Sequence, residues 1–161
     1  IESITIPSNV KQIESYAFFR AWELSTVIIK SDSKLESIGE FSFSSTKIKT
    51  ITIPSHLTKI EKKAFEARDL KEVNFLPNSN LLTIEEKAFY RTSIGSITIP
   101  PHDTQIERDA FEWCTIIEFI VNSETEDHNL LVFKVHENTI LMFPAKTTNR
   151  FKPNYYRFYY Y

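Results

Sequence analysis

Four histidines and one cysteine are the residues of this chain best suited to metal binding or nucleophilic catalysis. They are His56, His102, His128, His136 and Cys114. His56 and His102 hold the same place in two copies of a repeated pattern, two copies apart, which at the spacing of parallel strands separates them by about 10 Å. A single ion with ligand bonds of about 2 Å cannot bridge that distance. We therefore expect the histidines to be solvated and no metal or other cofactor to be bound.

The cysteine and the many hydroxyl side chains form no recognisable catalytic motif. The sequence contains no G-x-S-x-G, P-loop or H-E-x-x-H pattern. Its two glycines, Gly39 and Gly95, are too few for a phosphate-binding loop. Nothing near Cys114 marks an activated thiolate, so a small buried thiol is favoured over a nucleophile. We predict that the protein is not an enzyme.

Composition favours a folded protein without a nucleic-acid partner. The chain has 161 residues, of which 42% are hydrophobic and 14% aromatic, as in folded soluble proteins. A formal net charge of -2 provides no basic excess for phosphates. No apolar run approaches the roughly 20 residues of a membrane span, so we expect no membrane insertion within this chain. One cysteine allows no intrachain disulfide.

The dominant feature of the sequence is an internal repeat. The stretch IESITIPSNVKQIESYAF at the start returns as IKTITIPSHLTKIEKKAF and IGSITIPPHDTQIERDAF. Copies begin at Ile1, Leu24, Ile48, Leu70, Ile94 and Ile116, at spacings of 23, 24, 22, 24 and 22 residues. A near-constant period of this length predicts a solenoid. Each copy opens with apolar residues that alternate with polar ones, which predicts one short strand per repeat. Because the chain begins inside a repeat, we expect it to be a piece of a longer protein.

A second apolar group follows each strand and ends in a phenylalanine. These phenylalanines share one register, at Phe18, Phe43, Phe65, Phe89 and Phe111. Since neighbouring coils lie about 4.8 Å apart, we expect the rings to form a continuous column in the interior rather than an aromatic ligand site. The spacing of three and then four residues within this group favours a short helical turn that packs back onto the strands.

This pattern of a strand, an Ile-Pro pair and I-x-x-x-A-F resembles the BspA-like class of leucine-rich repeats. The resemblance covers residues 1 to about 115 closely. It implies an α/β repeat solenoid, right-handed, with a parallel sheet on the concave face and short helical or irregular turns on the convex side. Members of the family are displayed on the surfaces of bacteria and parasitic protists, where they bind host or matrix proteins. The resemblance therefore implies a cell-surface or secreted adhesin-like protein. It offers no catalytic residues.

Two positions of the repeat depart from the family pattern. Many family repeats place glycine after the second isoleucine and cysteine shortly after the phenylalanine. Here the first position holds Glu14, Gly39, Glu61, Glu85 and Glu107, and the second holds a cysteine only at Cys114. We expect the glutamates to form an acidic stripe along one edge. A solvated face is favoured for it, with calcium or a basic partner as the alternatives.

The strand residues that point away from the core are the candidate binding surface. They are mostly hydroxyl and β-branched residues without a dense charge field, a mixture suited to protein contact. β-branched residues also fit a pleated surface on packing grounds alone, so a purely structural role stays open. The predicted partner-binding residues are Thr5, Thr26, Ile28, Thr50, Thr52, Glu72, Asn74, Ser96, Thr98 and Ile120.

The C-terminal part departs from the repeat. We divide the chain into five repeats of 22 to 24 residues at 1–115 and a region at 116–161. This region contains a sixth strand, a segment from Leu130 that resembles an inserted β-hairpin of the family, and a tyrosine-rich tail that is either a cap or a truncated repeat. The function predicted is recognition of a protein ligand. The alternative is an intracellular scaffold that uses the same surface, which the lack of disulfides and of N-x-[ST] sequons supports.

Overall fold

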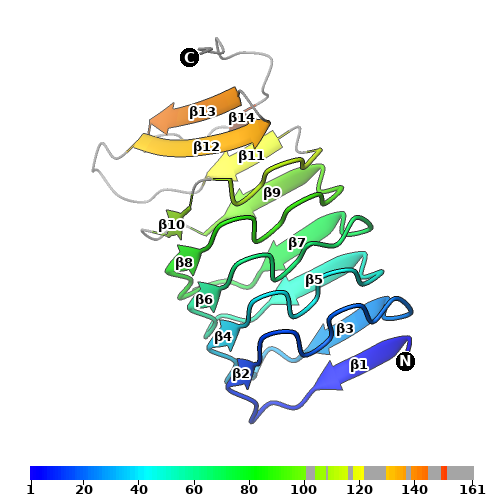
Figure 1. The fold of residues 1–161 in the computed structure, drawn as a ribbon. Coiled ribbons are helices and arrows are strands. Elements are labelled where there is room, and N and C mark those ends of the chain that lie inside the picture. The colour runs from blue at the N-terminus through cyan, green and yellow to red at the C-terminus, as the bar shows by residue number, and fades with distance from the viewer. Residues whose placement is uncertain are drawn as a thin grey trace.

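The protein is a parallel β-solenoid, seen in a computed structural model that describes residues 1–100, 104–107, 109–115, 118–121, 130–136, 139–144 and 150–151 (Figure 1). The coils are numbered 1 to 5 and span residues 1–23, 24–47, 48–69, 70–93 and 94–115. Each opens with a four-residue strand on one side of the stack. These long strands are β1 (Ser3–Ile6), β3 (Thr26–Ile29), β5 (Thr50–Ile53), β7 (Glu72–Phe75), β9 (Ser96–Ile99) and, after coil 5, β11 (Glu118–Val121). We call their outward surface the concave face.

Each coil has a second strand, which the sequence analysis did not anticipate. These two-residue strands are β2 (Gln12–Ile13), β4 (Ser37–Ile38), β6 (Lys59–Ile60), β8 (Thr83–Ile84) and β10 (Gln105–Ile106). They pair in parallel as one sheet in the order β10-β8-β6-β4-β2. The expectation of one strand per repeat was therefore wrong, because two residues are too short a stretch for an alternating pattern to show.

Beyond β11 the described strands pair antiparallel. β12 (Leu130–His136) pairs with β13 (Thr139–Pro144) as a hairpin. β14 (Arg150–Phe151) pairs antiparallel with β11, on the side of β11 opposite to β9. The tyrosine-rich tail, His102 and His128 lie outside the described residues. No helix among the described residues could cross a bilayer.

The predicted phenylalanine column is confirmed. Successive rings from Phe18 to Phe111 stack with centroids between 5.1 and 5.4 Å apart and interplanar angles between 5° and 10°. Phe43, Phe65, Phe89 and Phe111 are fully buried or nearly so. The leucines, isoleucines and valines of the strands complete one continuous core around the column. Each coil therefore buries its apolar side against its neighbours, as a solenoid requires.

Irregular turns, rather than a helical turn, carry each phenylalanine. The described residues contain no helix. Backbone N–H groups of alternate residues donate to the next coil instead of to their own: Phe43 N–H to the Ala64 carbonyl at 2.9 Å, and Phe65 N–H to Ala88 at 2.8 Å. The residue two before each phenylalanine has a positive φ, between 51° and 65°, at Tyr16, Phe41, Lys63, Lys87 and Asp109. The prediction of a helical turn was therefore wrong, because alternate backbone N–H groups of these turns donate to the next coil and cannot form the bonds of a helix.

The two longer coils contain an extra loop that is closed by buried serines. Ser33 in coil 2 and Ser79 in coil 4 are fully buried or nearly so. Their hydroxyl oxygens accept from the N–H groups of Leu35, at 3.2 Å, and Leu81, at 3.4 Å. These bonds satisfy backbone donors that the loop would otherwise bury unpaired, and they return the chain to the common register.

The column predicts a large difference between an interior and a surface substitution. Phe65→Ala should lower the free energy of unfolding by about 3–5 kcal/mol, because it empties a large buried aromatic site with rings on both sides. Urea denaturation followed by circular dichroism measures this. Thr52→Ala, on the concave face, is the control and should change stability far less. Equal losses in the two variants would contradict the assigned register.

Candidate protein-binding surface

The alternation along the long strands decides which side chains reach the concave face. In β3 and β9 the exposed residues alternate strictly with buried ones, so that Val27, Ile29, Ile97 and Ile99 face the core. The residues between them point outward. The predicted residues from Thr5 to Thr98 are accordingly exposed or half-buried, whereas Ile120 lies in β11, of whose side chains nothing is described.

The register aligns these residues in two rows that cross the strands. In the central row Thr5 lies opposite Ile28, Thr52 opposite Asn74, and Thr98 opposite Ile120. In the flanking row Thr50 lies opposite Glu72. The Asn74 amide donates to Glu72 Oε1 at 2.7 Å, which places the two rows side by side on one face.

The concave face is made of three paired ladders. β1 pairs with β3, β5 with β7, and β9 with β11, all parallel. Among the described strands, no ladder pairing joins β3 to β5 or β7 to β9, although the strands follow one another along the same side of the stack (Figure 1). A hollow of about 460 Å³ lies where β7 and β9 end, lined by Asn74, Phe75, Thr98 and Pro100 among others. Two predicted partner-binding residues, Asn74 and Thr98, thus border a recess rather than a flat sheet.

The chemistry of this face is that of polar contact with scattered apolar area. Threonine and serine hydroxyls can both donate and accept hydrogen bonds, and the Asn74 amide can do the same. Ile28 adds an apolar side chain that is 47% exposed. Glu72 is the one charged residue among the predicted residues. Such a surface can recognise a protein by hydrogen bonds and shape without strong charge steering.

Cys114 is a buried thiol, as predicted. It is 5% exposed, and its Sγ lies 2.8 Å from the Phe89 carbonyl and 3.1 Å from Thr92 Oγ1. Burial raises the pKa of the thiol to about 11, although the hydrogen bond with Thr92 acts in the opposite direction. The thiol is therefore protonated near neutral pH, and its role is to fill the interior of coil 5.

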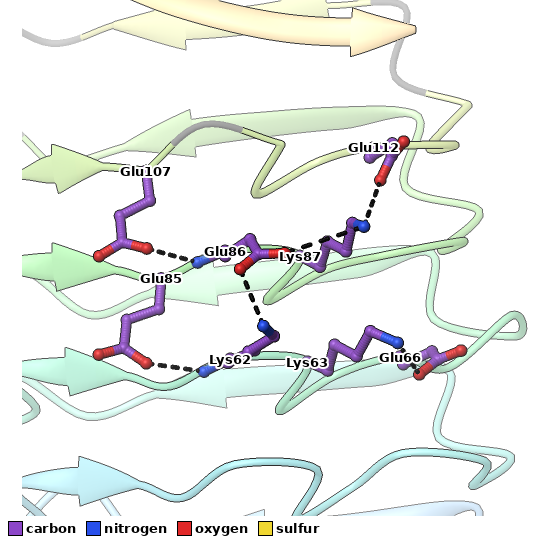
Figure 2. A network of polar contacts seen from close by, with 8 residues as sticks. All are labelled: Lys62, Lys63, Glu66, Glu85, Glu86, Lys87, Glu107 and Glu112. Carbon is purple, nitrogen blue, oxygen red and sulfur yellow. Dashed lines mark hydrogen bonds and ion pairs between the residues drawn. The ribbon is translucent and has the colours of Figure 1, made fainter. Parts of the chain in front are cut away.

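Three glutamates of the repeat bind backbone groups of the preceding coil instead of forming a merely solvated stripe, and Figure 2 shows two of them, Glu85 and Glu107. Glu61 Oε2 accepts from the Glu40 N–H at 3.1 Å, Glu85 Oε2 from the Lys62 N–H at 2.9 Å, and Glu107 Oε2 from the Glu86 N–H at 2.9 Å. We call these bonds the glutamate clamps. Each clamp satisfies a donor that the turn leaves without a backbone acceptor.

Lysines on the same side connect the clamps to further carboxylates. Lys59 Nζ lies 2.7 Å from Glu85 Oε1, and this hydrogen bond raises the pKa of the lysine. Lys62 Nζ lies 2.9 Å from Glu86 Oε2, which lowers the pKa of that carboxyl (Figure 2). Three of the carboxylates offered as calcium ligands, those of Glu61, Glu85 and Glu107, are thus already used by groups of the chain itself. No group of three or more metal-ligating side chains occurs among the described residues.

Gly39 takes the clamp position in coil 2 because the coils approach closely there. A Cβ at Gly39 would lie 2.5 Å from the backbone nitrogen of Ser15 and 2.7 Å from the Ile13 carbonyl oxygen. No side chain fits without moving the backbone of coil 1. The absence of a glutamate at this one position therefore has a steric cause.

A second hollow, which the sequence analysis did not single out, lies beside the turns of coils 1 to 4. Its lining includes Trp22, Lys47, Arg68, Asp69 and Arg91. The sequence gives one signal for it: Trp22, Lys47 and Asp69 each stand four residues after a phenylalanine of the column. The signal was hidden because the three residues share a place but no chemical character.

Comparison with known proteins identifies the repeat. The model of the BspA type leucine rich repeat region matches residues 1–118 in six copies. The crystal structure of the pneumococcal vaccine antigen PcpA is similar at 25% sequence identity and a TM-score of 0.67 over 80% of this chain. The crystal structure of a leucine rich cell surface protein from Faecalibacterium prausnitzii is similar at 24% sequence identity and a TM-score of 0.55 over 89% of this chain. This chain covers 32% and 46% of those two chains. A search of curated proteins found no match.

The clamps predict that Glu85→Ala lowers the free energy of unfolding by about 1 kcal/mol, because the Lys62 N–H loses its acceptor. Glu85→Gln should lose less, since an amide oxygen can still accept that bond although the pairing with Lys59 is gone. Glu14→Ala is the matched control: Glu14 holds the same place in coil 1, and its carboxylate makes no clamp within the described residues. Urea titrations of the three variants measure the effects, and equal stability of Glu85→Ala and Glu14→Ala would contradict the clamps.

Burial of Cys114 predicts low reactivity and an alkaline loss of stability. A thiol reagent at pH 8 should label native protein slowly and unfolded protein completely, and Cys114 is the single labelling site. Because the thiol pKa rises from 9.0 to about 11 on folding, its contribution to stability is complete below pH 9 and declines as the pH rises to 11.

Cys114→Ala is the control for this alkaline effect. Over pH 9 to 11 its stability should fall less than that of the unmodified protein, as measured by urea titration at each pH. Rapid labelling of the native protein at pH 8 would show that the thiol is accessible, contrary to the structure.

Proposed function

Because the chain belongs to the BspA-type leucine-rich repeat family, we propose that it recognises a protein partner through the concave face, as part of a surface-displayed adhesin-like protein. The observation that carries this proposal is the pair of outward rows of hydroxyl, amide and isoleucine side chains. Within each of the three ladders the outward residues lie in register, and the inward residues of β1, β3, β5, β7 and β9 are apolar. Side chains that face outward are not needed for the core and are available for contact.

The size of the face indicates how a partner would sit on it. Six strands at a spacing of about 4.8 Å extend about 24 Å, and four residues along a strand extend about 13 Å. The flat area is therefore only about 300 Å², whereas a standard interface buries about 800 Å² on each partner. A partner of ordinary size therefore contacts the strands at its centre and also the loops at the strand ends, including the hollow beside Asn74 and Thr98.

The surface location is supported by similarity. The family resemblance is to proteins displayed on cells, and the structure from Faecalibacterium prausnitzii is described as a leucine rich cell surface protein. We propose extracellular-matrix or host-cell proteins as the class of partner, with purified matrix proteins as the probes. Binding of a cytoplasmic protein with no binding of any matrix protein would favour the scaffold alternative.

The double variant Thr52→Arg with Thr98→Arg should weaken binding of a matrix protein by at least about tenfold, because it places two unmatched charges at the centre of the contact. Surface plasmon resonance with immobilised matrix proteins measures this. Gln12→Arg with Gln105→Arg is the matched control. It adds the same charges at exposed residues of the short-strand sheet, and it should leave binding unchanged.

Two outcomes would overturn the role of the concave face. One is equal binding by the concave double variant and its control, with both folded as judged by circular dichroism. The other is loss of binding on removal of residues 152–161 from a chain whose concave face is intact, while the double variant binds normally. The function would then belong to the C-terminal segment.

A further inference from the structure

A cleft of about 470 Å³ lies beside the turns of coils 1 to 4. We call it the tryptophan cleft. Trp22, Lys47 and Asp69 hold equivalent places in coils 1, 2 and 3, and Arg68 and Arg91 come from coils 3 and 4. At about 4.8 Å per coil, four coils give the cleft a length of about 14 Å, which accommodates one or two sugar rings.

The cleft exists because coil 3 turns inward where its neighbours do not. Ser45 and Arg91, each two residues after a column phenylalanine, donate their N–H groups to the next coil, at 3.0 and 3.1 Å. Ala67 holds that place in coil 3, but its N–H bonds within its own coil to the Phe65 carbonyl at 2.7 Å. Ala67 is fully buried, whereas Ser45 and Arg91 are exposed. The recess is therefore a built irregularity of the stack.

An exposed indole forms one wall of the cleft. Trp22 is 61% exposed, the second most exposed of the large hydrophobic side chains described. Exposing the large apolar indole ring to water is unfavourable, so a ligand that covers its flat face by stacking would be stabilised. The apolar C–H face of a pyranose ring matches such a face, because the ring hydroxyls then remain at its edge for the polar walls.

The charges around the cleft favour one negative group. Lys47 forms an ion pair with Glu23 at 3.4 Å, and Glu66 forms one with Lys63 at 3.8 Å. Within the described residues Arg68, Asp69 and Arg91 make no ion pair. Arg91 lies over the Tyr90 ring, with its guanidinium carbon 5.0 Å from the ring centroid. Two guanidinium groups and one carboxylate give the unpaired groups a net charge of +1.

We propose that the tryptophan cleft binds an acidic sugar, a pyranose that carries a carboxylate. The Trp22 indole stacks on the C–H face of the ring, Arg68 and Arg91 donate to the sugar carboxylate, and Ser45 and Asp69 bind ring hydroxyls. Guanidinium groups suit a carboxylate because they present paired donors in one plane. A phosphate carries a charge of about −1.5 to −2, which exceeds the net charge of +1 of the unpaired groups and which the nearby Asp69 carboxylate disfavours.

The test uses the fluorescence of Trp22 alone. The chain has two tryptophans, so Trp113→Phe leaves Trp22 as the single reporter. In this background 3′-sialyllactose and a hyaluronan tetrasaccharide are titrated to about 10 mM, which detects binding even at a Kd near 1 mM. At least one of the two should shift or quench the emission. Lactose, which lacks the carboxylate, should bind at least about tenfold more weakly.

Variants assign the contacts. Arg68→Gln and Arg91→Gln should each weaken binding of the acidic sugar several-fold and leave lactose unaffected. Trp22→Ala should abolish the heat of binding in calorimetry, whereas Trp113→Phe should not. Thr52→Arg with Thr98→Arg should leave sugar binding unchanged, so this inference and the proposed function fail or succeed separately.

Three results would overturn the proposal. The first is no change in Trp22 emission with either acidic sugar. The second is equal binding of lactose and sialyllactose, which would remove the role of the arginines. The third is a response only to a nucleotide or to an acidic hexapeptide, which would assign the cleft to a different class of ligand.

Discussion

The stacking of each coil on the next is the constraint on which the rest of the structure depends. One coil of 22 to 24 residues cannot enclose its own apolar side, so the phenylalanines, isoleucines and leucines must be covered by the coils before and after it. The rings of the phenylalanine column keep centroid distances of 5.1 to 5.4 Å through five coils. These distances are close to the spacing of about 4.8 Å between hydrogen-bonded strands, so ring stacking and backbone pairing are compatible with one rise per coil.

Backbone hydrogen bonds and the glutamate clamps adapt the chain to that rise. Left-handed backbone at residues other than glycine is unfavourable by roughly 1–2 kcal/mol each, yet it recurs before every phenylalanine of the column. It is retained because it points alternate N–H groups at the next coil, where carbonyl groups accept them. In coils 2, 3 and 4 the N–H of the residue just before the left-handed one is accepted by a glutamate of the following coil. With two glycines in the chain, the fold relies on these bonds rather than on glycine to hold its turns.

Stacking constrains the inward residues of each coil and leaves the outward residues free to differ between coils. Inward positions repeat nearly the same residue type in each coil, while outward positions change from coil to coil. Two surfaces arise in this way. On the concave face, polar and isoleucine side chains lie opposite one another within each ladder, and beside the turns a single inward bend at Ala67 opens the tryptophan cleft. The two surfaces use different residues, so each can acquire binding chemistry independently.

The sequence by itself determined the period of the repeat, the long strands, the phenylalanine register and the burial of Cys114. These features follow from which residues are apolar and at what spacing, and burial in a stack depends on little else. The tertiary structure decided the short strands, the absence of helical turns, the role of the glutamates and the tryptophan cleft. For the short strands, the turns and the glutamates, the deciding partner lies about 22 residues away in another coil, as Glu85 does from the Lys62 N–H. The tryptophan cleft depends on a bond within coil 3, from the Ala67 N–H to the Phe65 carbonyl. A periodic pattern reports that a residue faces inward or outward, but it does not report which donor of the neighbouring coil its side chain meets.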